Sequence, residues 1–310
     1  MTDTDAGPSG PAVVAVVGPT ATGKSDLAVA LAQRIGGEIV NADSMQLYRG
    51  MDIGTAKLPP DERGGVPHHL LDIWPVTKSA AVAEYQQLAR EVIADIAARG
   101  RTPVLVGGSG LYVRAVLDRL EFPGESPAIR AALTAELAEL GPAVLHARLT
   151  RRDPAAGAAI LPSNGRRIVR ALEVMELTGE LFTARMPAFD SVYPSVQLAL
   201  EHPELESRVR LRVERMMTGG LLDEVRRLLP LGLRDSPTAG KALGYQQLLA
   251  VLDDEGNVTG ELNEAVELTV GRTWRFVRRQ RSWFRRDPRL HWLDAGAPDL
   301  LDRALALLPR

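Results

Sequence analysis

The sequence contains no cysteine, and this absence narrows the chemistry that the chain can perform. Without thiols there is neither a disulfide bond nor a thiolate metal site, which is compatible with a cytoplasmic protein. Histidine adds little, because only His68 and His69 are adjacent and the remaining spacings are not those of metal ligands. The residue types therefore do not favour a metal site built from cysteine and histidine.

Long apolar runs are also missing. No stretch approaches the ~20 apolar residues that a membrane span needs. Residues 1–11, MTDTDAGPSGP, are polar and rich in turn formers, which indicates a disordered tail rather than a signal peptide. We therefore expect a cytoplasmic protein without a membrane partner. The 310 residues suffice for a buried core, and because no pattern suggests a dimer seam, we expect a monomer.

The chain lacks an excess of positive charge. Its formal net charge of −2 argues against a nonspecific nucleic-acid binder. The average hides a local contrast, because the segment RTWRFVRRQRSWFRRDPR (272–289) is dense in arginine and its only acidic residue is Asp287. A local basic surface is therefore expected near the C-terminus.

Short β-branched runs alternate with helical patterns. Residues 12–18, 37–43 and 103–108 are continuous and apolar, as strands buried on both faces of a parallel sheet are. Residues 24–35 and 80–100 between them have helical periodicity, and 195–201 and 290–294 would complete the sheet. The pattern predicts an α/β fold with a P-loop NTPase-like core, in which helices flank a parallel sheet.

The stretch from 123 to 194 is different, because its pattern is helical throughout. Ser126 and Pro127 have the residue types of an N-cap and a first-turn proline, and they open the run AIRAALTAELAEL. We therefore expect an all-helical subdomain (123–194) inserted into an α/β core made of 12–122 and 195–310, the latter including the C-terminal helices.

The stretch GPTATGKS (18–25) satisfies the pattern G-x-x-x-x-G-K-S between a predicted strand and a predicted helix. In that position backbone N–H groups and the positive helix end converge on an oxyanion. Lys24 would reach the terminal phosphate, and Ser25 would hold a Mg²⁺ ion. The phosphate-binding residues expected here are Gly18, Thr20, Ala21, Thr22, Gly23, Lys24 and Ser25.

An NTPase should also have an aspartate after an apolar strand, but the strand at 103–108 runs into GGSG. The acid is instead Asp43, at the end of the second strand, where it should share a crevice with the phosphate loop. There a carboxylate can orient and deprotonate an acceptor, although Asp43 could also be a simple turn cap. Two enzyme classes fit these residues: a small-molecule kinase of the shikimate or gluconate type, and an enzyme that transfers a group from a pyrophosphate.

Longer motifs separate these classes. Seven stretches are informative together: GPTATGKS, DSMQLYRGMDIGTAK (43–57), PHHLLDI (67–73), PVLVGGSGLY (103–112), RRIVRALEV (166–174), GYQQL (244–248) and RRQRSWFR (278–285). Through them the chain resembles, from about Val13 to Asp294, the tRNA dimethylallyltransferases, also called isopentenyl-tRNA transferases. The phosphate loop alone is a weak match, whereas the second stretch and the order of all seven are specific.

The resemblance implies a transfer reaction. Dimethylallyl pyrophosphate would lie on the amides of Thr20 to Ser25, with Lys24 and Mg²⁺ neutralising the leaving group. The acceptor would be N6 of adenine 37, in the anticodon stem-loop of tRNAs that read codons starting with U. Asp43 would be the general base and Thr20 a second catalytic residue. The product would be N6-(dimethylallyl)adenosine. A kinase and a non-catalytic tRNA-binding protein remain the alternatives.

The adenine must leave the base stack to reach such a crevice. The resemblance implies that Asp43, Ser44, Met45, Gln46 and Ser109 hold it, and that further tRNA contacts come from Arg130, Arg166, Arg167, Arg170, Lys241, Gly244, Tyr245 and Gln246. Arg166 and Arg170 are four residues apart and share a helix face, with Arg167 one step away. For the arginines, a solvated helix face is the alternative.

Two further arginines, Arg208 and Arg212, also share a predicted helix face. By the resemblance they clamp the pyrophosphate, Arg212 most strongly, because guanidinium groups suit bidentate phosphate contacts. In RRQRSWFR we expect Trp283 and Phe284 to pack in the core rather than to stack on bases. The chain departs from the family at Trp274, where an arginine is common; either Arg272 or Arg275 replaces that contact, or the contact is absent.

Overall fold

The computed structural model describes residues 12–182 and 189–309, and it divides the chain into two compact units. The core unit comprises residues 1–118 and 191–310, and the insertion comprises 119–190. The insertion thus begins and ends slightly earlier than the limits of 123 and 194 expected from the sequence. The proposed N-terminal tail, 1–11, lies outside the described residues.

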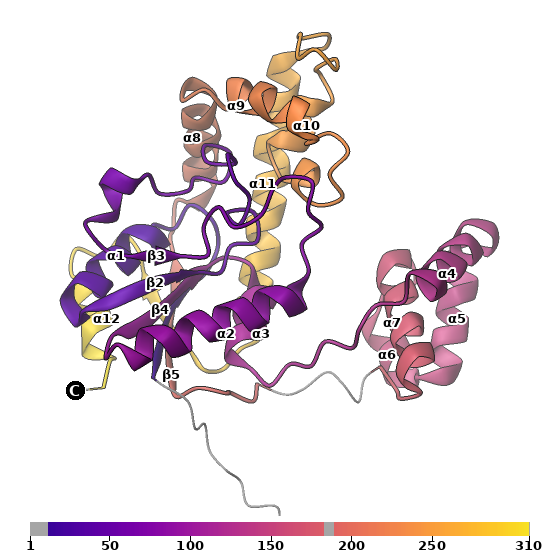
Figure 1. Ribbon diagram of the computed structural model, residues 1–310, viewed down its shortest axis with the longest axis horizontal. Coiled ribbons are helices and arrows are strands. Elements are labelled where there is room, and N and C mark those ends of the chain that lie inside the picture. Colours follow the sequence, from indigo (N-terminus) through magenta and orange to yellow (C-terminus); the bar gives the residue numbers. More distant parts are fainter. Residues whose placement is uncertain (1–11, 183–188, 310) are drawn as a thin grey trace, which may run out of the picture. The chain divides into compact units, whose positions relative to one another are not determined.

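The core unit is built on a parallel sheet of six strands in the order β3-β2-β4-β1-β5-β6 (Figure 1). This confirms the predicted α/β class. The strands are β1 (Val13–Val17), β2 (Gly37–Asn41), β3 (His68–His69), β4 (Thr102–Gly107), β5 (Ser195–Glu201) and β6 (Leu290–Asp294). Only β3 was not predicted, since two residues are too few to produce a periodic signal.

Helices cover both faces of the sheet, because alternate residues of each buried strand face opposite sides. On one face Val13, Ala15 and Val17 pack with side chains of α2 and α3, and on the other Val14 and Val16 pack with α1 and α12. The helices of the core unit are α1 (Lys24–Ile35), α2 (Val82–Ala98), α3 (Gly110–Leu117), α8 (Leu205–Thr218), α9 (Leu221–Leu228), α10 (Tyr245–Leu249), α11 (Leu262–Phe284) and α12 (Leu300–Ala306).

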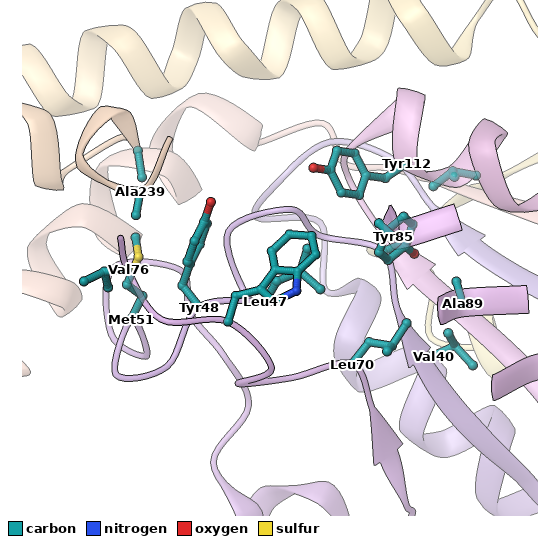
Figure 2. Packing of buried hydrophobic residues seen from close by; sticks show 14 of the residues in the cluster. Val40, Leu47, Tyr48, Met51, Leu70, Val76, Tyr85, Ala89, Tyr112 and Ala239 are labelled. Carbon is teal, nitrogen blue, oxygen red and sulfur yellow. The ribbon is translucent and has the colours of Figure 1, made fainter. Parts of the chain in front are cut away.

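The larger hydrophobic cluster extends beyond the sheet into the loop that follows β2. Leu47, Tyr48 and Met51 are fully buried there and pack in the same cluster as Tyr85 of α2 (Figure 2). The hydroxyl of Tyr85 also donates to the carbonyl of Asn41 at 2.9 Å. The apolar side chains of the loop therefore anchor it in the core, and its polar side chains are the ones that can contact a ligand.

The carboxyl ends of β1, β2 and β4 lie level with one another. The register pairs Val17 with Gly107 and Asn41 with Val106. A Cβ on Gly107 would lie 2.3 Å from the carbonyl oxygen of Ala42, so only glycine permits this approach of β2 and β4. The three segments that follow these strands therefore meet at one edge of the sheet, where ligands of such folds bind.

The insertion is an all-helical unit, made of α4 (Pro127–Leu140), α5 (Pro142–Arg152), α6 (Pro154–Ala159) and α7 (Gly165–Thr178). Its own core includes Leu133, Leu149 and Leu172. As predicted, Ser126 caps α4, and its hydroxyl accepts from the N–H of Ile129 at 3.4 Å.

Candidate active site

The phosphate loop connects β1 to α1 through a tight, partly left-handed turn. Gly18 has φ +130°, and a Cβ there would lie 2.7 Å from the carbonyl oxygen of Leu200 on β5. Ala21 adopts φ +66° although it is not glycine, a conformation that costs energy and is common at functional sites. Thr22 braces the turn, because its hydroxyl donates to the carbonyl of Pro19 at 2.9 Å. The loop is thus held in a defined shape by contacts within the core unit.

Lys24 lies in this loop with its charge largely shielded from water. Its Nζ donates to the carbonyl of Pro19 at 2.5 Å. Burial and the neighbouring Arg212 lower the pKa of Lys24 to about 7, while Asp43 acts in the opposite direction. The charge of Arg212 thus lies close enough to disfavour the charged form of Lys24. A bound polyanion would relieve this repulsion between the two cations.

The backbone N–H of Thr20 is already bonded within the protein. It donates to the side-chain Oε1 of Gln280, from α11, at 3.0 Å. Gln280 in turn donates from Nε2 to the carbonyl of Gly108 at 2.8 Å. Thr20 does line the pocket described below, and its amide has this internal partner. Gln280 was not among the predicted site residues.

Asp43 lies two residues after the end of β2 and is oriented by Asn41. The N–H of Asp43 donates to Asn41 Oδ1 at 2.9 Å, and Asn41 Nδ2 donates to the Asp43 carbonyl at 3.1 Å. Asp43 Oδ1 accepts from the N–H of Met45 at 3.0 Å, so the aspartate does cap a turn. No residue in the described part of the chain donates a hydrogen bond to its Oδ2. One oxygen therefore serves the turn and the other remains available for a ligand.

The segment after β4 meets the segment after β2. Ser109 Oγ accepts from the N–H of Ser44 and lies 3.3 Å from the Ser44 hydroxyl. Gln46 is directed elsewhere, because its Nε2 donates to the carbonyl of Thr55 at 3.2 Å. The structure therefore brings Asp43, Ser44 and Ser109 together, as the order of the motifs implied.

A buried carboxylate holds the loop at 52–54. Glu224 of α9 is 1% exposed and accepts from the N–H groups of Asp52, Ile53 and Gly54 at 3.0, 2.8 and 3.1 Å. It also accepts from the hydroxyl of Tyr245 at 2.5 Å. Burial and the adjacent Glu224 raise the pKa of Tyr245, so this phenol stays protonated and remains a donor.

Tyr245 itself is fully buried against this loop, and a Cβ on Gly54 would lie 2.4 Å from its ring. Its side chain therefore packs in the core. The tRNA contacts expected for Gly244, Tyr245 and Gln246 remain predictions. Glu224 was missed because a single glutamate in a helical pattern carries no local signal of a buried role.

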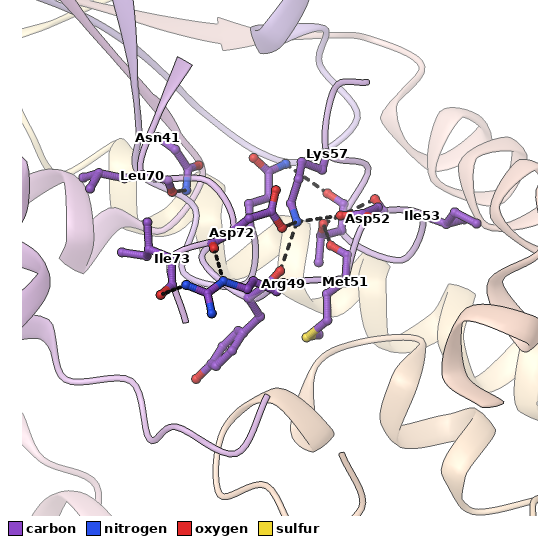
Figure 3. A network of polar contacts seen from close by, with 12 residues as sticks. Asn41, Arg49, Met51, Asp52, Ile53, Lys57, Leu70, Asp72 and Ile73 are labelled. Atoms are coloured by element: carbon purple, nitrogen blue, oxygen red, sulfur yellow. Dashed lines mark hydrogen bonds and ion pairs between the residues drawn. The ribbon is translucent and has the colours of Figure 1, made fainter. Parts of the chain in front are cut away.

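Lys57 secures the other end of the same loop. Its Nζ donates to Asp52 Oδ1 and Asp72 Oδ1, both at 2.6 Å, and to the carbonyl of Tyr48 at 3.0 Å (Figure 3). Asp72 has φ +58°, so the lysine also stabilises a strained residue. The motif at 43–57 is thus a loop closed by ionic and backbone contacts, with Gly54 and Thr55 at the pocket.

Arg208 and Arg212 of α8 approach this region from the opposite side. Arg208 Nε donates to the carbonyl of Ala21 at 2.8 Å, and Arg212 Nη2 donates to the carbonyl of Thr55 at 3.3 Å. Of the two, Arg212 lines the pocket and lies near both Lys24 and Asp43, as their mutual effects on pKa indicate. Burial lowers the pKa of Arg212, and the charge of Asp43 counteracts that effect.

These segments enclose a pocket of about 710 Å³ within the core unit. Its wall includes five cationic side chains and one carboxylate, so it suits a ligand with several negative charges. The cations are Arg212, Lys241, Arg272, Arg275 and Arg279, and the carboxylate is Asp43. Predicted site residues in the wall are Thr20, Asp43, Ser44, Met45, Ser109, Arg212, Lys241, Gly244 and Gln246.

The aromatic residues of α11 differ from expectation. Phe284 is buried as predicted, but the prediction for Trp283 was wrong, because its side chain is 39% exposed. Its indole packs against Gly110, where a Cβ would lie 2.2 Å from the ring, so only glycine leaves room for the indole at that point. Trp274 packs against the buried cluster of Leu205, Val209 and Val277, while Arg272 and Arg275 line the pocket.

The four arginines of the insertion that were predicted to contact tRNA fall into two pairs. Arg130 and Arg170 contact the fully buried carboxylate of Glu173, at 2.8 and 2.9 Å. Arg166 and Arg167 are exposed, and neither has an ion pair with a described residue. The first pair therefore stabilises the insertion, and the second pair presents unneutralised charge.

The residues described by the structure include no group of three or more histidine, aspartate or glutamate side chains that could hold a metal ion. Ser25 is the first-turn hydroxyl of α1, and no hydrogen bond of its side chain to a described residue is present. Mg²⁺ usually takes one or two protein ligands and completes its shell with phosphate oxygens and water, so a single hydroxyl beside a phosphate site fits it.

We predict that Lys24→Met stabilises the ligand-free protein at low pH. The pKa of Lys24 is 10.5 when exposed and about 7 in the fold. The energetic cost of burying its charge therefore has its full size below pH 7 and disappears above about pH 10. The gain at pH 6 should be roughly 2–4 kcal/mol and should shrink as the pH rises toward 10. Denaturant unfolding of the variant, of wild type and of the exposed control Lys241→Met measures this; a destabilised variant at pH 6 would contradict it.

We also predict that Tyr245→Phe lowers the free energy of unfolding by about 1–2 kcal/mol, because Glu224 loses a buried hydrogen bond while the ring stays in place. Tyr193→Phe is the matched control, since no described residue bonds to the Tyr193 hydroxyl. Thermal unfolding of both variants is the measurement. Equal changes in the two variants would show that the Glu224 contact adds no stability.

No helix in 12–182 or 189–309 is long and apolar enough to span a membrane.

A family model described as IPP transferase matches residues 46–287. The tRNA dimethylallyltransferase of Streptomyces coelicolor is 63% identical over 98% of this chain and 97% of its own length. That of Thermobifida fusca is 64% identical over 96% and 94%.

A solved structure is similar along the whole chain as well. The tRNA isopentenylpyrophosphate transferase of Bacillus halodurans is 40% identical, with a TM-score of 0.68, over 96% of this chain and 94% of that one. The family model covers more than half of the chain, and the relatives match it nearly from end to end. The chain therefore belongs to the IPP transferase family.

Proposed function

We propose that this protein is a tRNA dimethylallyltransferase, which transfers the dimethylallyl group of dimethylallyl pyrophosphate to N6 of adenine 37 in tRNAs that read codons starting with U. The observation that carries the proposal is the meeting of Thr20 of the phosphate loop, Asp43 and Arg212 at one cationic pocket, with Lys24 close to the last two. Relatives at 63% and 64% identity that bear this name support the reaction class.

On the donor side, the free amides of the phosphate loop, Lys24 and Arg212 bind the pyrophosphate. Breaking the bond between the allylic carbon and the pyrophosphate oxygen leaves an electron pair, and hence negative charge, on the leaving group. Fixed cations and N–H dipoles aimed at that oxygen stabilise the charge as it develops. Ser25 would hold a Mg²⁺ ion, which supplies further neutralisation of the pyrophosphate when bound.

On the acceptor side, Asp43 Oδ2 takes a proton from the adenine N6 as the nitrogen forms its bond to the allylic carbon. The amide that caps Asp43 Oδ1, from Met45, fixes the direction of the carboxylate. Ser44 and Ser109 offer hydroxyls at the same place for the edge of a base turned out of its stack. One proton and one dimethylallyl group thus exchange at N6, and pyrophosphate leaves.

The RNA is held by charge. Lys241 and the arginines of α11 contact the phosphates of the anticodon stem-loop around the pocket, and Arg166 and Arg167 make phosphate contacts from the insertion. Such contacts orient RNA without reading its sequence. A small-molecule kinase would have no use for this excess of cations.

We predict that the protein transfers label from dimethylallyl pyrophosphate to an unmodified anticodon stem-loop with A36-A37-A38 in the presence of Mg²⁺. Asp43→Asn should lower kcat by roughly 10²-fold or more and leave stem-loop binding nearly unchanged, as expected for loss of a general base. Asp61→Asn, at an exposed site, is the control. Consumption of ATP on a small acceptor, without label in RNA, would support the kinase instead.

We predict that Arg166→Ala combined with Arg167→Ala weakens stem-loop binding and reduces the salt dependence of log Kd by about 1–2 units of slope. Arg130→Ala should change the slope less and lower the stability of the insertion, because Arg130 neutralises Glu173. Binding titrations at several salt concentrations, with thermal unfolding alongside, measure both. An unchanged slope in the double variant would exclude these arginines from the RNA interface.

A further inference from the structure

Gln280 is a polar side chain that the proposed chemistry does not yet use. It lies in α11 and is 6% exposed, so it cannot contact RNA directly. Its Oε1 accepts from the N–H of Thr20 at 3.0 Å, and its Nε2 donates to the carbonyl of Gly108 at 2.8 Å. Both bonds join segments far apart in the sequence, and both use the side chain in one fixed orientation.

Each partner of Gln280 belongs to a different half of the site. Thr20 starts the loop that binds the donor, and it lines the pocket. Gly108 precedes Ser109, whose hydroxyl contacts Ser44 beside Asp43. Gly108 has no side chain at a point where a Cβ would lie 2.5 Å from Gln280 Nε2, so the turn is shaped to receive the amide.

We propose that Gln280 is a positioning residue that sets the distance between the donor loop and the acceptor turn. This inference rests on the proposed function, because that distance matters only when a group passes between the two. Transfer requires the reacting atoms to be held near contact, and a shift of about 1 Å can cost roughly 10²-fold in rate. Two opposed bonds from one rigidly held amide resist such a shift in either direction.

The chemistry of the amide explains why glutamine is required. The site offers one donor, the N–H of Thr20, and one acceptor, the carbonyl of Gly108, and an amide side chain matches both. Methionine has a similar length but leaves both backbone groups unpaired. An ionised carboxylate still accepts from Thr20, but it repels the carbonyl of Gly108.

The first test compares Q280M with wild type and with S282A, a control at an exposed position on the same helix. We expect Q280M to lower kcat by about 10–100-fold while KM for dimethylallyl pyrophosphate and for the stem-loop changes by less than about 3-fold. S282A should retain both constants. Near-normal kcat in Q280M, or a loss confined to KM, overturns the inference.

The second test uses Q280E, in which protonation restores a donor. A protonated carboxyl can donate to Gly108 and accept from Thr20, so the rate of Q280E relative to wild type should rise as the pH falls. The charged groups nearby, Lys24, Asp43, Arg281 and Glu201, are present in both proteins, and the ratio therefore reports on the substituted side chain. A ratio independent of pH overturns the inference, because a purely structural defect would not depend on that proton.

The two tests distinguish failure of this inference from failure of the proposed function. If wild type transfers no label to the stem-loop, the proposed function fails and the comparison with Q280M cannot begin. If wild type is active and Q280M matches it, the function stands and the positioning role of Gln280 is rejected.

Discussion

The site depends on the close, level approach of three parallel strand ends. β1, β2 and β4 finish at the same edge because their register is fixed by buried β-branched residues and because Gly107 lets β2 and β4 approach closely. The segments after them carry the phosphate loop, Asp43 and Ser109. Their convergence is therefore a consequence of sheet geometry, and the same edge binds ligands in other folds of this kind.

Sheet geometry alone does not fix the loops, because their backbone groups have no strand partners. Buried polar side chains supply such partners, among them Glu224 for the amides at 52–54 and Gln280 for Thr20 and Gly108. A buried polar group that loses its partners is costly, so each of these side chains forms a specific contact. The loops are thereby tied to helices that lie far from them in the sequence.

Local signals were readable from the sequence, and distant contacts were not. The helix at 24–35, the Ser126 cap and the strand at 195–201 follow from periodicity and capping chemistry, and the structure has them at those positions. Gln280 and Glu224 act on residues that are 260 and about 170 positions away, so no local pattern marks them. Trp283 was misjudged for the same reason, because its packing partner Gly110 lies in another element, 173 positions away.

The clustering of cations in the pocket lowers the stability of the folded protein, and this cost supports a role of the pocket in binding an anion. Arg212 and the arginines of α11 line the pocket together with one carboxylate, and Lys24 lies close to Arg212 and Asp43. Burial moves the pKa of Lys24 to about 7 and lowers that of Arg212. Stability alone would not favour such a group, because buried cations repel one another and lose hydration. A bound polyanion would offset the repulsion, so this electrostatic cost is the counterpart of the pyrophosphate binding that we propose.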